Sequence, residues 1–417
     1  MLPLLPVLAL AASVYASPIT SRDDRPKIIP GRYLVQLQTG ANAATVASHH
    51  ASARRLARRN DLHEPIERTF SIGGLNAYLG DFDEQAAADI LSLDEVVSVV
   101  PDEYIYLEKT DFPPVQPQRR ALTTQSPSIW SLGDLSHKAA GSTQYVYDSS
   151  AGAGMTAYVF DTGIRLTHQE FEGRARFGIN GVTNSTDPSN ASKDTDGHGT
   201  HCAGTVAGKT YGAAKKASLV DVKVFDGASG SISATLTGIQ WAVNDVVSRG
   251  AQRTSVFSMS LGAETTATLL DDAVKAAYDV GILSIVAAGN ADAPVGNNSP
   301  ARLAQSFTVA MSRPDRGRVS LIANVFGSNY GPEVDVFAPG SDIVSASHLS
   351  DTGTSSKTGT SMATPLVAGL VCYLRKLEGG LNTPTQVTNR ILQLGLKGVV
   401  SDTKGSPNVL VNNGSGA

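Results

Sequence analysis

The chain has 417 residues, 41% of them hydrophobic and 17% charged, and a formal net charge of −4. This balance is typical of a folded globular protein, and the length suggests two or more domains, one of them large. Neither nucleic acid nor a membrane surface is an expected partner, because both attract concentrated basic surfaces. With only two cysteines, Cys202 and Cys372, burial rather than a disulfide framework must stabilise the fold.

The first 16 residues form a short apolar run that ends in Val14-Tyr15-Ala16. A run of this kind, closed by small residues, predicts a secretory signal peptide. Later apolar stretches are too short for a transmembrane helix, so we expect a soluble, secreted protein, with a vacuolar destination as the alternative. Four Asn-x-Ser/Thr triplets are compatible with glycosylation, and they begin at Asn184, Asn190, Asn297 and Asn413.

Residues 32–107 follow the pattern strand, helix, strand, strand, helix, strand. This pattern predicts a small α+β domain of ferredoxin-like layout over about residues 29–108. A proline-containing stretch, residues 109–120, follows it and ends in Arg119-Arg120. Such a segment is typical of an extended, cleavable linker, and it predicts a domain boundary there.

Beyond Ala121, buried apolar strands alternate with helical stretches. Each strand ends in Gly, Asp or Asn, as in residues 155–160, 218–225, 254–261 and 282–288. This pattern predicts an α/β fold in three layers, with a mainly parallel sheet covered by helices on both faces. Ligands of such a sheet bind beyond the carboxyl ends of its strands.

Three polar segments supply the groups that activate a hydroxyl nucleophile. Asp161 follows a buried strand, where a carboxylate can orient a histidine. His198 lies among small residues at a predicted helix start and can take and return a proton. Ser361 precedes Pro365 and an apolar helix, so we expect it near a helix N-terminus. Asn290, after another strand, can donate a hydrogen bond to a developing oxyanion.

Each of these residues also has an ordinary structural interpretation, as a turn residue or a helix cap. His198 and His201 could instead be metal ligands, although no second Cys/His cluster or HExxH pattern accompanies them. Cys202 could be the nucleophile, although it is better explained as a buried thiol. The combination of four residues, in the order Asp, His, Asn, Ser, favours a serine-nucleophile enzyme; this order of the triad differs from that in α/β-hydrolases.

At these residues the chain resembles the subtilase family of serine proteases. It is most similar to the proteinase K branch and to secreted fungal alkaline proteinases of the oryzin type. The matching blocks are Tyr158 to Ile164, Asp196 to Thr205, Ser258 to Gly262, Ala287 to Asn290 and Gly359 to Pro365. The resemblance implies a subtilisin-like domain over residues 121–417, an inhibitory propeptide over residues 17–120 that also aids folding, and a signal peptide over residues 1–16.

The resemblance also implies residues that bind an extended peptide substrate through their backbone and line the pocket before the scissile bond. They are Ala228, Ser229, Gly230, Ser231, Ile232, Ser260, Leu261, Gly262, Ala287, Ala288 and Gly289. Small apolar linings lead us to expect a preference for large apolar or aromatic side chains. A structural calcium ion is implied at Asp335, with the carbonyls of Ala304 and Ser306, whereas no cofactor is expected for catalysis.

We therefore expect a secreted serine endopeptidase that is made as an autoprocessed zymogen and acts on proteins and peptides as a monomer. A peptide-binding protein without chemistry is the rival from another class, and the complete set of four catalytic groups argues against it.

Overall fold

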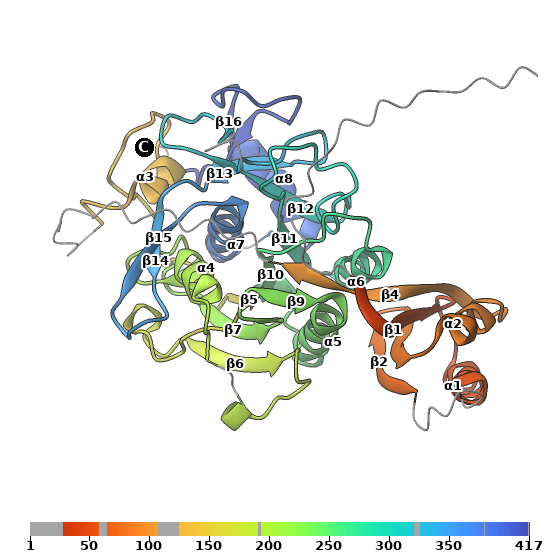
Figure 1. Cartoon of the computed structure of the whole chain (residues 1–417). Helices are drawn as coiled ribbons and strands as arrows, with labels where there is room; N and C mark the ends of the chain where they lie inside the picture. The colour runs from red at the N-terminus through yellow and green to blue at the C-terminus, as the bar shows by residue number, and fades with distance from the viewer. Residues whose placement is uncertain are drawn as a thin grey trace, which may run out of the picture.

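The computed structural model describes residues 28–57, 65–106, 125–190, 193–320, 326–378, 380–415 and 417. They form a small N-terminal domain beside a larger one (Figure 1). The expected signal peptide and the linker at residues 109–120 lie outside the described residues.

The N-terminal domain has the predicted order of elements. These are β1 (Ile28–Leu37), α1 (Ala43–Ala57), β2 (Ile66–Ile72), β3 (Leu75–Asp81), α2 (Glu84–Leu91) and β4 (Val96–Tyr106). The strands pair antiparallel in the order β2-β3-β1-β4. Because side chains alternate along a strand, Val35 packs in a separate core with residues of α1 and α2, whereas Leu34 joins the core of the larger domain.

A nine-stranded sheet forms the middle layer of the larger domain, as predicted. Its order is β16-β17-β13-β12-β11-β10-β5-β7-β6, and every pairing is parallel except β16 with β17. The strands are β5 (Thr156–Asp161), β6 (Ala175–Asn180), β7 (Ser218–Lys223), β10 (Ser255–Met259), β11 (Leu283–Ala287), β12 (Ser306–Ser312), β13 (Val336–Pro339), β16 (Leu396–Lys397) and β17 (Val409–Leu410).

Helices cover both faces of this sheet. They are α3 (Trp130–Ser136), α4 (His198–Ala207), α5 (Ile232–Ser248), α6 (Thr268–Asp279), α7 (Thr360–Leu377) and α8 (Pro384–Leu394). Along β5, Tyr158 and Phe160 belong to the core beneath α5 and α6, whereas Ala157 and Val159 belong to the core beneath α4 and α7.

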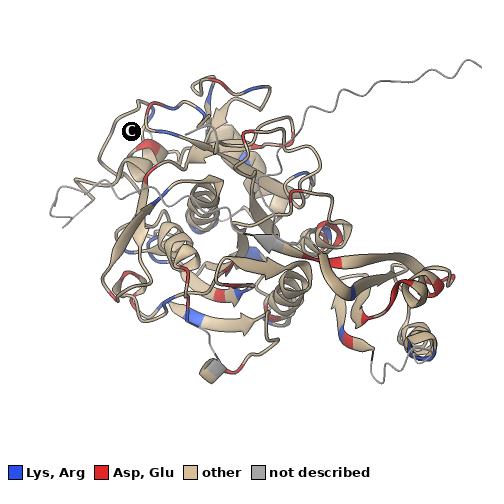
Figure 2. Cartoon of the chain, in the orientation of Figure 1, with Lys and Arg blue, Asp and Glu red and all other residues tan. Residues whose placement is uncertain are grey.

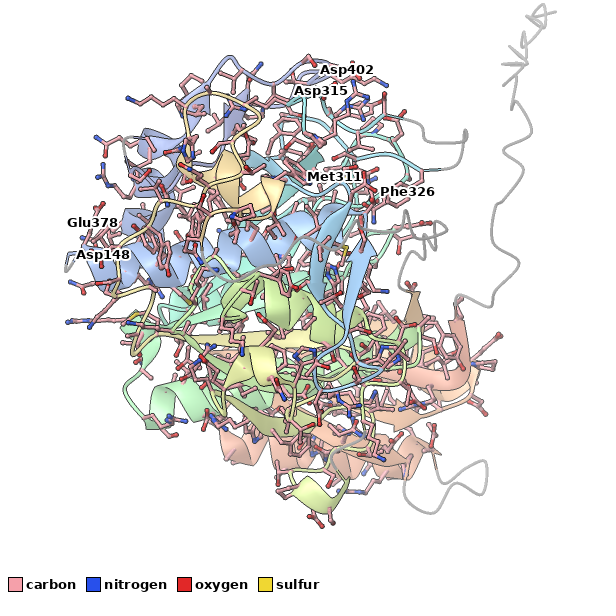
Figure 3. All side chains as sticks on the ribbon, turned by 90° about the vertical axis from the view of Figure 1, so that its left-hand side faces the viewer. Asp148, Met311, Asp315, Phe326, Glu378 and Asp402 are labelled. Carbon is pink, nitrogen blue, oxygen red and sulfur yellow. The ribbon has the colours of Figure 1, made fainter. Side chains whose placement is uncertain are left out.

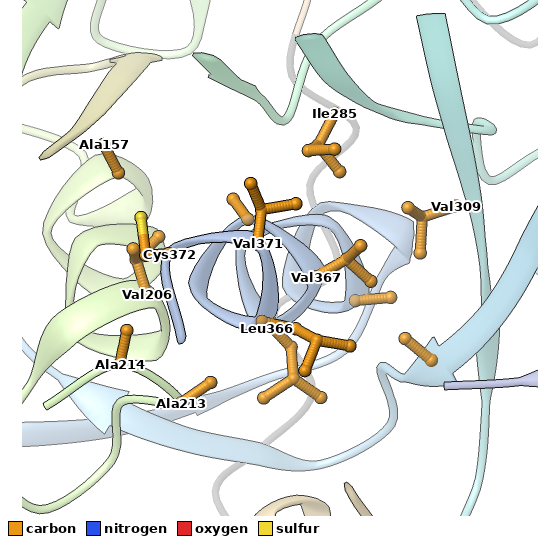
Figure 4. Close-up of a cluster of buried hydrophobic side chains, with 14 of the residues drawn as sticks. Ala157, Val206, Ala213, Ala214, Ile285, Val309, Leu366, Val367, Val371 and Cys372 are labelled. Carbon is orange, nitrogen blue, oxygen red and sulfur yellow. The ribbon is translucent and has the colours of Figure 1, made fainter. Parts of the chain in front are cut away.

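Helix α7 runs through the second of these cores, and its apolar side chains are almost completely buried. Figure 4 shows Val367 and Val371 directed toward Ile285 and Val309 of the sheet, with Cys372 beside Val206. A helix buried on most of its surface is held in one position, so a side chain at its first turn is also fixed.

The remaining elements of the described residues are short. They are β8 (Phe225–Asp226), β9 (Ser229–Ser231), β14 (Ile343–Ala346), β15 (Thr354–Lys357) and three 3₁₀ turns, at Gln169–Phe171, Pro188–Asn190 and Gln252–Thr254. Strands β14 and β15 form an antiparallel hairpin.

The two domains share a sheet. Strand β4 pairs antiparallel with β9, so that Tyr104 lies opposite Ser231 and Tyr106 opposite Ser229. From β2, which is separated from β4 by two strands of the sheet, Arg68 donates to the Thr237 hydroxyl of α5 at 2.7 Å. The N-terminal domain is therefore docked on α5 and α6 by strand addition as well as by apolar packing.

Acidic and basic residues are scattered over both domains, as Figure 2 shows, in agreement with the small net charge. Among the residues that the structure describes, no helix is both long and apolar enough to cross a membrane.

Candidate active site

Asp161 and His198 form a buried pair at the carboxyl end of β5. The His198 Nδ1 atom lies 2.8 Å from Asp161 Oδ1 and 3.0 Å from Oδ2. The two residues are 1% and 8% exposed. The Thr162 N–H also donates to Asp161 Oδ1 at 2.8 Å. A carboxylate held in this way fixes the imidazole with Nε2 free to accept a proton.

The start of α4 places His198. Gly199 lies so close to β5 that a Cβ there would come within 2.2 Å of the Gly163 carbonyl oxygen, so only glycine fits. The Asp194 carboxylate accepts hydrogen bonds from the N–H groups of Gly197 and Thr200, at 2.7 and 2.9 Å, and caps the helix. The sequence interpretation missed Asp194, although an Asp shortly before a helix start is a recognisable capping signal.

Electrostatics make His198 a strong base. Burial alone would lower its pKa, but the Asp161 carboxylate outweighs burial and raises the pKa of His198 well above its ordinary value. In contrast, burial lowers the pKa of His201 to about 3, and its Nε2 is paired with the Ile343 carbonyl at 2.8 Å. The Nε2 atom of His201 is thus engaged in the core, and His201 does not belong to the group of described residues whose ligand atoms could hold a metal together with His198.

Cys202 lies one helical turn after His198, with Sγ 3.7 Å from Nδ1. Asp161, His198 and Cys202 are the one group in the described part of the chain whose ligand atoms could together hold a metal ion. Burial raises the pKa of the Cys202 thiol above its ordinary value, so the thiol stays protonated near neutrality. A protonated thiol is a poor nucleophile, and this argues against Cys202 as the reacting group.

Ser361 lies in the first turn of α7, which begins at Thr360 rather than at the apolar run expected from the sequence. Pro365 is therefore inside the helix and not in its first turn. Because proline has no N–H, the Ser361 carbonyl lacks its helical donor. The Ser260 hydroxyl donates to this carbonyl at 2.8 Å, and the Cys202 thiol does so at 3.4 Å. One backbone oxygen thus joins α7, α4 and the segment after β10.

The Ser361 hydroxyl donates to the Ser260 carbonyl at 3.4 Å. Among the described hydrogen bonds it has none to His198, although Cys202 contacts both residues. Bonds between a nucleophile and its base are often formed only once substrate is bound, so this geometry is compatible with their pairing.

Asn290 follows β11 and is 6% exposed. Its side-chain oxygen accepts from the Thr360 N–H at 2.8 Å and from the Thr360 hydroxyl at 2.9 Å. The amide nitrogen therefore points away from Thr360 and has no acceptor among the described residues. A free donor beside Ser361 is what an oxyanion site requires. Thr360 was missed from the sequence, because its partner is 70 residues away along the chain.

The segments expected to bind substrate lie around these groups. Ser229 to Ser231 form β9, a segment that we expected to pair with a peptide, and β4 of the N-terminal domain pairs antiparallel with it. Ser260 and Leu261 are buried next to Ser361, and Ala287 and Ala288 are buried beside Asn290. Gly289 has φ +97°, a conformation that favours glycine.

Asp335 directly precedes β13, and its carboxylate accepts the Thr308 N–H of β12 at 2.7 Å. Ser306 begins the same strand, so the expected calcium donors Ala304, Ser306 and Asp335 lie at the amino ends of two adjacent strands. Burial raises the pKa of Asp335 to about 6. A desolvated carboxylate next to exposed backbone is suited to a hard cation, although it is a single charged donor.

The four glycosylation triplets are in different surroundings. Asn184 and Asn297 are exposed, whereas the side chain of Asn190 lies outside the described residues. Asn413 is 1% exposed, and its amide nitrogen donates to the Val146 carbonyl at 2.9 Å. The expectation for Asn413 is therefore corrected, because a glycan on that nitrogen cannot be accommodated in the folded protein.

Comparison with known proteins finds matches for both domains. Residues 152–416 match the subtilase family, and residues 32–108 match peptidase inhibitor I9. Alkaline protease 1 of Aspergillus clavatus is 43% identical over 98% of this chain and 97% of its own length. An alkaline proteinase of Hapsidospora chrysogena is 41% identical over 99% and 98%. The crystal structure of a cold adapted subtilisin-like serine proteinase covers 69% of this chain and 99% of its own, with 39% identity and a TM-score of 0.62.

Proposed function

Because the chain belongs to the subtilase family and is a serine endopeptidase made with an I9-type propeptide, we propose that Asp161, His198 and Ser361 are its catalytic triad. The observation that carries this proposal is the buried Asp161–His198 pair, 2.8 Å apart, beside a serine fixed at the first turn of α7. Three segments far apart in sequence supply these groups, and Cys202 contacts both His198 and the Ser361 carbonyl.

In the mechanism, Ser361 Oγ attacks the peptide carbonyl while His198 Nε2 takes its proton. Asp161 holds the imidazole and stabilises its charged form. The Asn290 amide nitrogen and the Ser361 N–H donate to the oxyanion, in a geometry that Thr360 fixes beforehand. The leaving amine receives the proton from His198, and water then releases the acyl-enzyme by the same steps.

The propeptide acts as an inhibitor because β4 occupies the strand position beside β9. We propose that residues 17–120 are removed after Arg120, so that the mature protease begins at Ala121, and that residues 1–16 direct secretion rather than vacuolar sorting. The sequence similarity to fungal alkaline proteases over nearly the full chain supports this organisation.

We further propose a broad specificity, with large apolar or aromatic residues before the scissile bond. Support comes from the small, buried linings Leu261, Ala287 and Ala288 beside Gly289. Calcium is assigned a structural role at Asp335 and the carbonyls of Ala304 and Ser306, whereas catalysis uses protein groups alone. The protease is expected to act as a monomer.

The test is a Ser361→Ala protein, processed in trans so that its propeptide is removed. Casein hydrolysis and fluorophosphonate labelling should both be lost. The matched control is Ser248→Ala, at the exposed end of α5, which should behave as the unmodified protein. Near-normal hydrolysis by the Ser361→Ala protein would refute the assignment of the nucleophile.

A further inference from the structure

The segment that carries Asn290 leaves the regular sheet before it reaches the active site. Strand β11 ends at Ala287, and beyond it Gly289 and Asp292 both have positive φ angles, +97° and +49°. A backbone outside the ladder needs other partners for its N–H and C=O groups. The position of Asn290 is therefore decided by whatever satisfies residues 288–293.

The backbone of residues 327–330 supplies some of these partners, and the side chain of Asn329 supplies three more. Its amide oxygen accepts from the N–H of Ala291 at 2.9 Å and from the N–H of Ala293 at 3.1 Å. Its amide nitrogen donates to the carbonyl of Ala288 at 3.0 Å. Asn329 thus bonds the backbone on both sides of Asn290, in the way that a neighbouring strand would. The backbone offers two N–H donors, of Ala291 and Ala293, and one carbonyl acceptor, of Ala288. Only an amide side chain can accept from the first two and donate to the third.

Asn329 is itself held firmly. It lies three residues after Phe326, one of the residues labelled in Figure 3. It is 1% exposed, and its own N–H donates to the Gly289 carbonyl at 2.8 Å. The preceding residue, Ser328, receives a hydrogen bond on its carbonyl from the fully buried Arg318 at 2.7 Å. Arg318 also pairs with Asp292. Arg318 therefore contacts both the residue before Asn329 and Asp292, which lies two residues after Asn290.

We propose that Asn329 is a positioning residue for the oxyanion site. It acts through Asn290 and does not touch the substrate. This inference rests on the proposed role of Asn290 as the oxyanion donor. Thr360 fixes the rotation of the Asn290 amide, whereas Asn329 fixes the backbone from which that side chain extends. Loss of Asn329 should displace the donor, and displacements on the order of 1 Å can cost ~100-fold in rate.

The experiment uses the mature protease, made from the full precursor, and a chromogenic peptide amide with an aromatic residue before the scissile bond. Asn329→Ala and the isosteric Asn329→Asp should each lower kcat about 10- to 100-fold, with KM within about twofold. The aspartate keeps the acceptor but faces the Ala288 carbonyl with no donor. Thermal unfolding verifies that each variant is folded, and Asn329→Asp preserves the test if the alanine variant is unstable.

A double-mutant cycle separates positioning from general destabilisation. In an Asn290→Ala background, the Asn329 changes should lower kcat less than about threefold. The matched control is Asn408→Ala, since Asn408 also binds one N–H and one carbonyl, both of Val400, outside the active site. It should leave kcat unchanged.

Three outcomes would overturn the inference: folded Asn329 variants with kcat within twofold of normal, an equal loss in the Asn290→Ala background, or an equal loss in Asn408→Ala. If the Asn290→Ala protein kept full kcat, the proposed oxyanion role of Asn290 would be refuted. This result differs from the three outcomes that refute the positioning role of Asn329, so the two proposals can fail separately.

Discussion

Replacing Asp102 by alanine should weaken inhibition by the propeptide. Asp102 of β4 is completely buried at the first turn of α5, where its carboxylate accepts from the Ser233 hydroxyl at 2.7 Å and the Ser233 N–H at 3.2 Å. A buried hydrogen bond to a charged group contributes about 1.5–3 kcal/mol, and its loss also leaves the Ser233 donors unpaired. Burial raises the pKa of Asp102, which shows that desolvation offsets part of the gain. We therefore expect about 2–3 kcal/mol, or roughly 30- to 150-fold.

The assay is inhibition of the mature protease by residues 17–120 added in trans, a fragment whose domain has a hydrophobic core of its own. Glu103→Ala is the matched control, because it removes the same charge one residue away. Among the described residues, the Glu103 side chain has one hydrogen bond, a solvent-exposed contact of 3.4 Å with Thr265, so its loss should change the inhibition constant less than about fivefold. Equal weakening by both substitutions would refute the argument that burial of Asp102 at α5 determines affinity.

Three further predictions concern pH and calcium. His198 must be neutral to act as a base, and its pKa is raised, so kcat/KM should fall as pH decreases through a value above 6.5; an acid limb at or below 6.5 would contradict this. Burial lowers the pKa of Lys215 from 10.5 to about 7, so the unfolded chain binds more protons between these values and stability should rise with pH across that window. In urea unfolding of the Ser361→Ala protein, Lys215→Met should remove this rise, which amounts to several kcal/mol, and an unchanged slope would count against it. Chelation of calcium should lower the unfolding temperature by about 5 °C. Asp335→Asn should abolish that dependence, and a variant that still responds to chelation would exclude Asp335 as a ligand.

The sequence predicted the arrangement of both domains because hydrophobic periodicity determines which faces are buried. In the small domain the alternation of Leu34 and Val35 corresponds to the two faces of the observed sheet. In the large domain, continuous apolar runs became parallel strands covered on both sides. Polar residues directly after these apolar runs stand out in the sequence, so Asp161 and Asn290 could be identified as candidate catalytic residues.

Contacts between segments distant in sequence could not be predicted in the same way. Thr360 bonds Asn290, and Asn329 supports it, through tertiary contacts that leave no periodic pattern. The start of α7 was placed too late because Pro365 normally belongs to a first turn. The burial of Asn413 could likewise not be predicted from the sequence, since its partner Val146 is 267 residues away along the chain.

The unusual place of Pro365 has a consequence for when the protease becomes active. The missing N–H releases one carbonyl, at Ser361, to partners from the two other parts of the domain that deliver Ser260 and Cys202. Both partners are supplied only when α4, α7 and the end of β10 have come together. Partly folded molecules should therefore be unable to cleave their neighbours, because the reactive serine acquires these contacts only after three segments far apart in sequence have assembled.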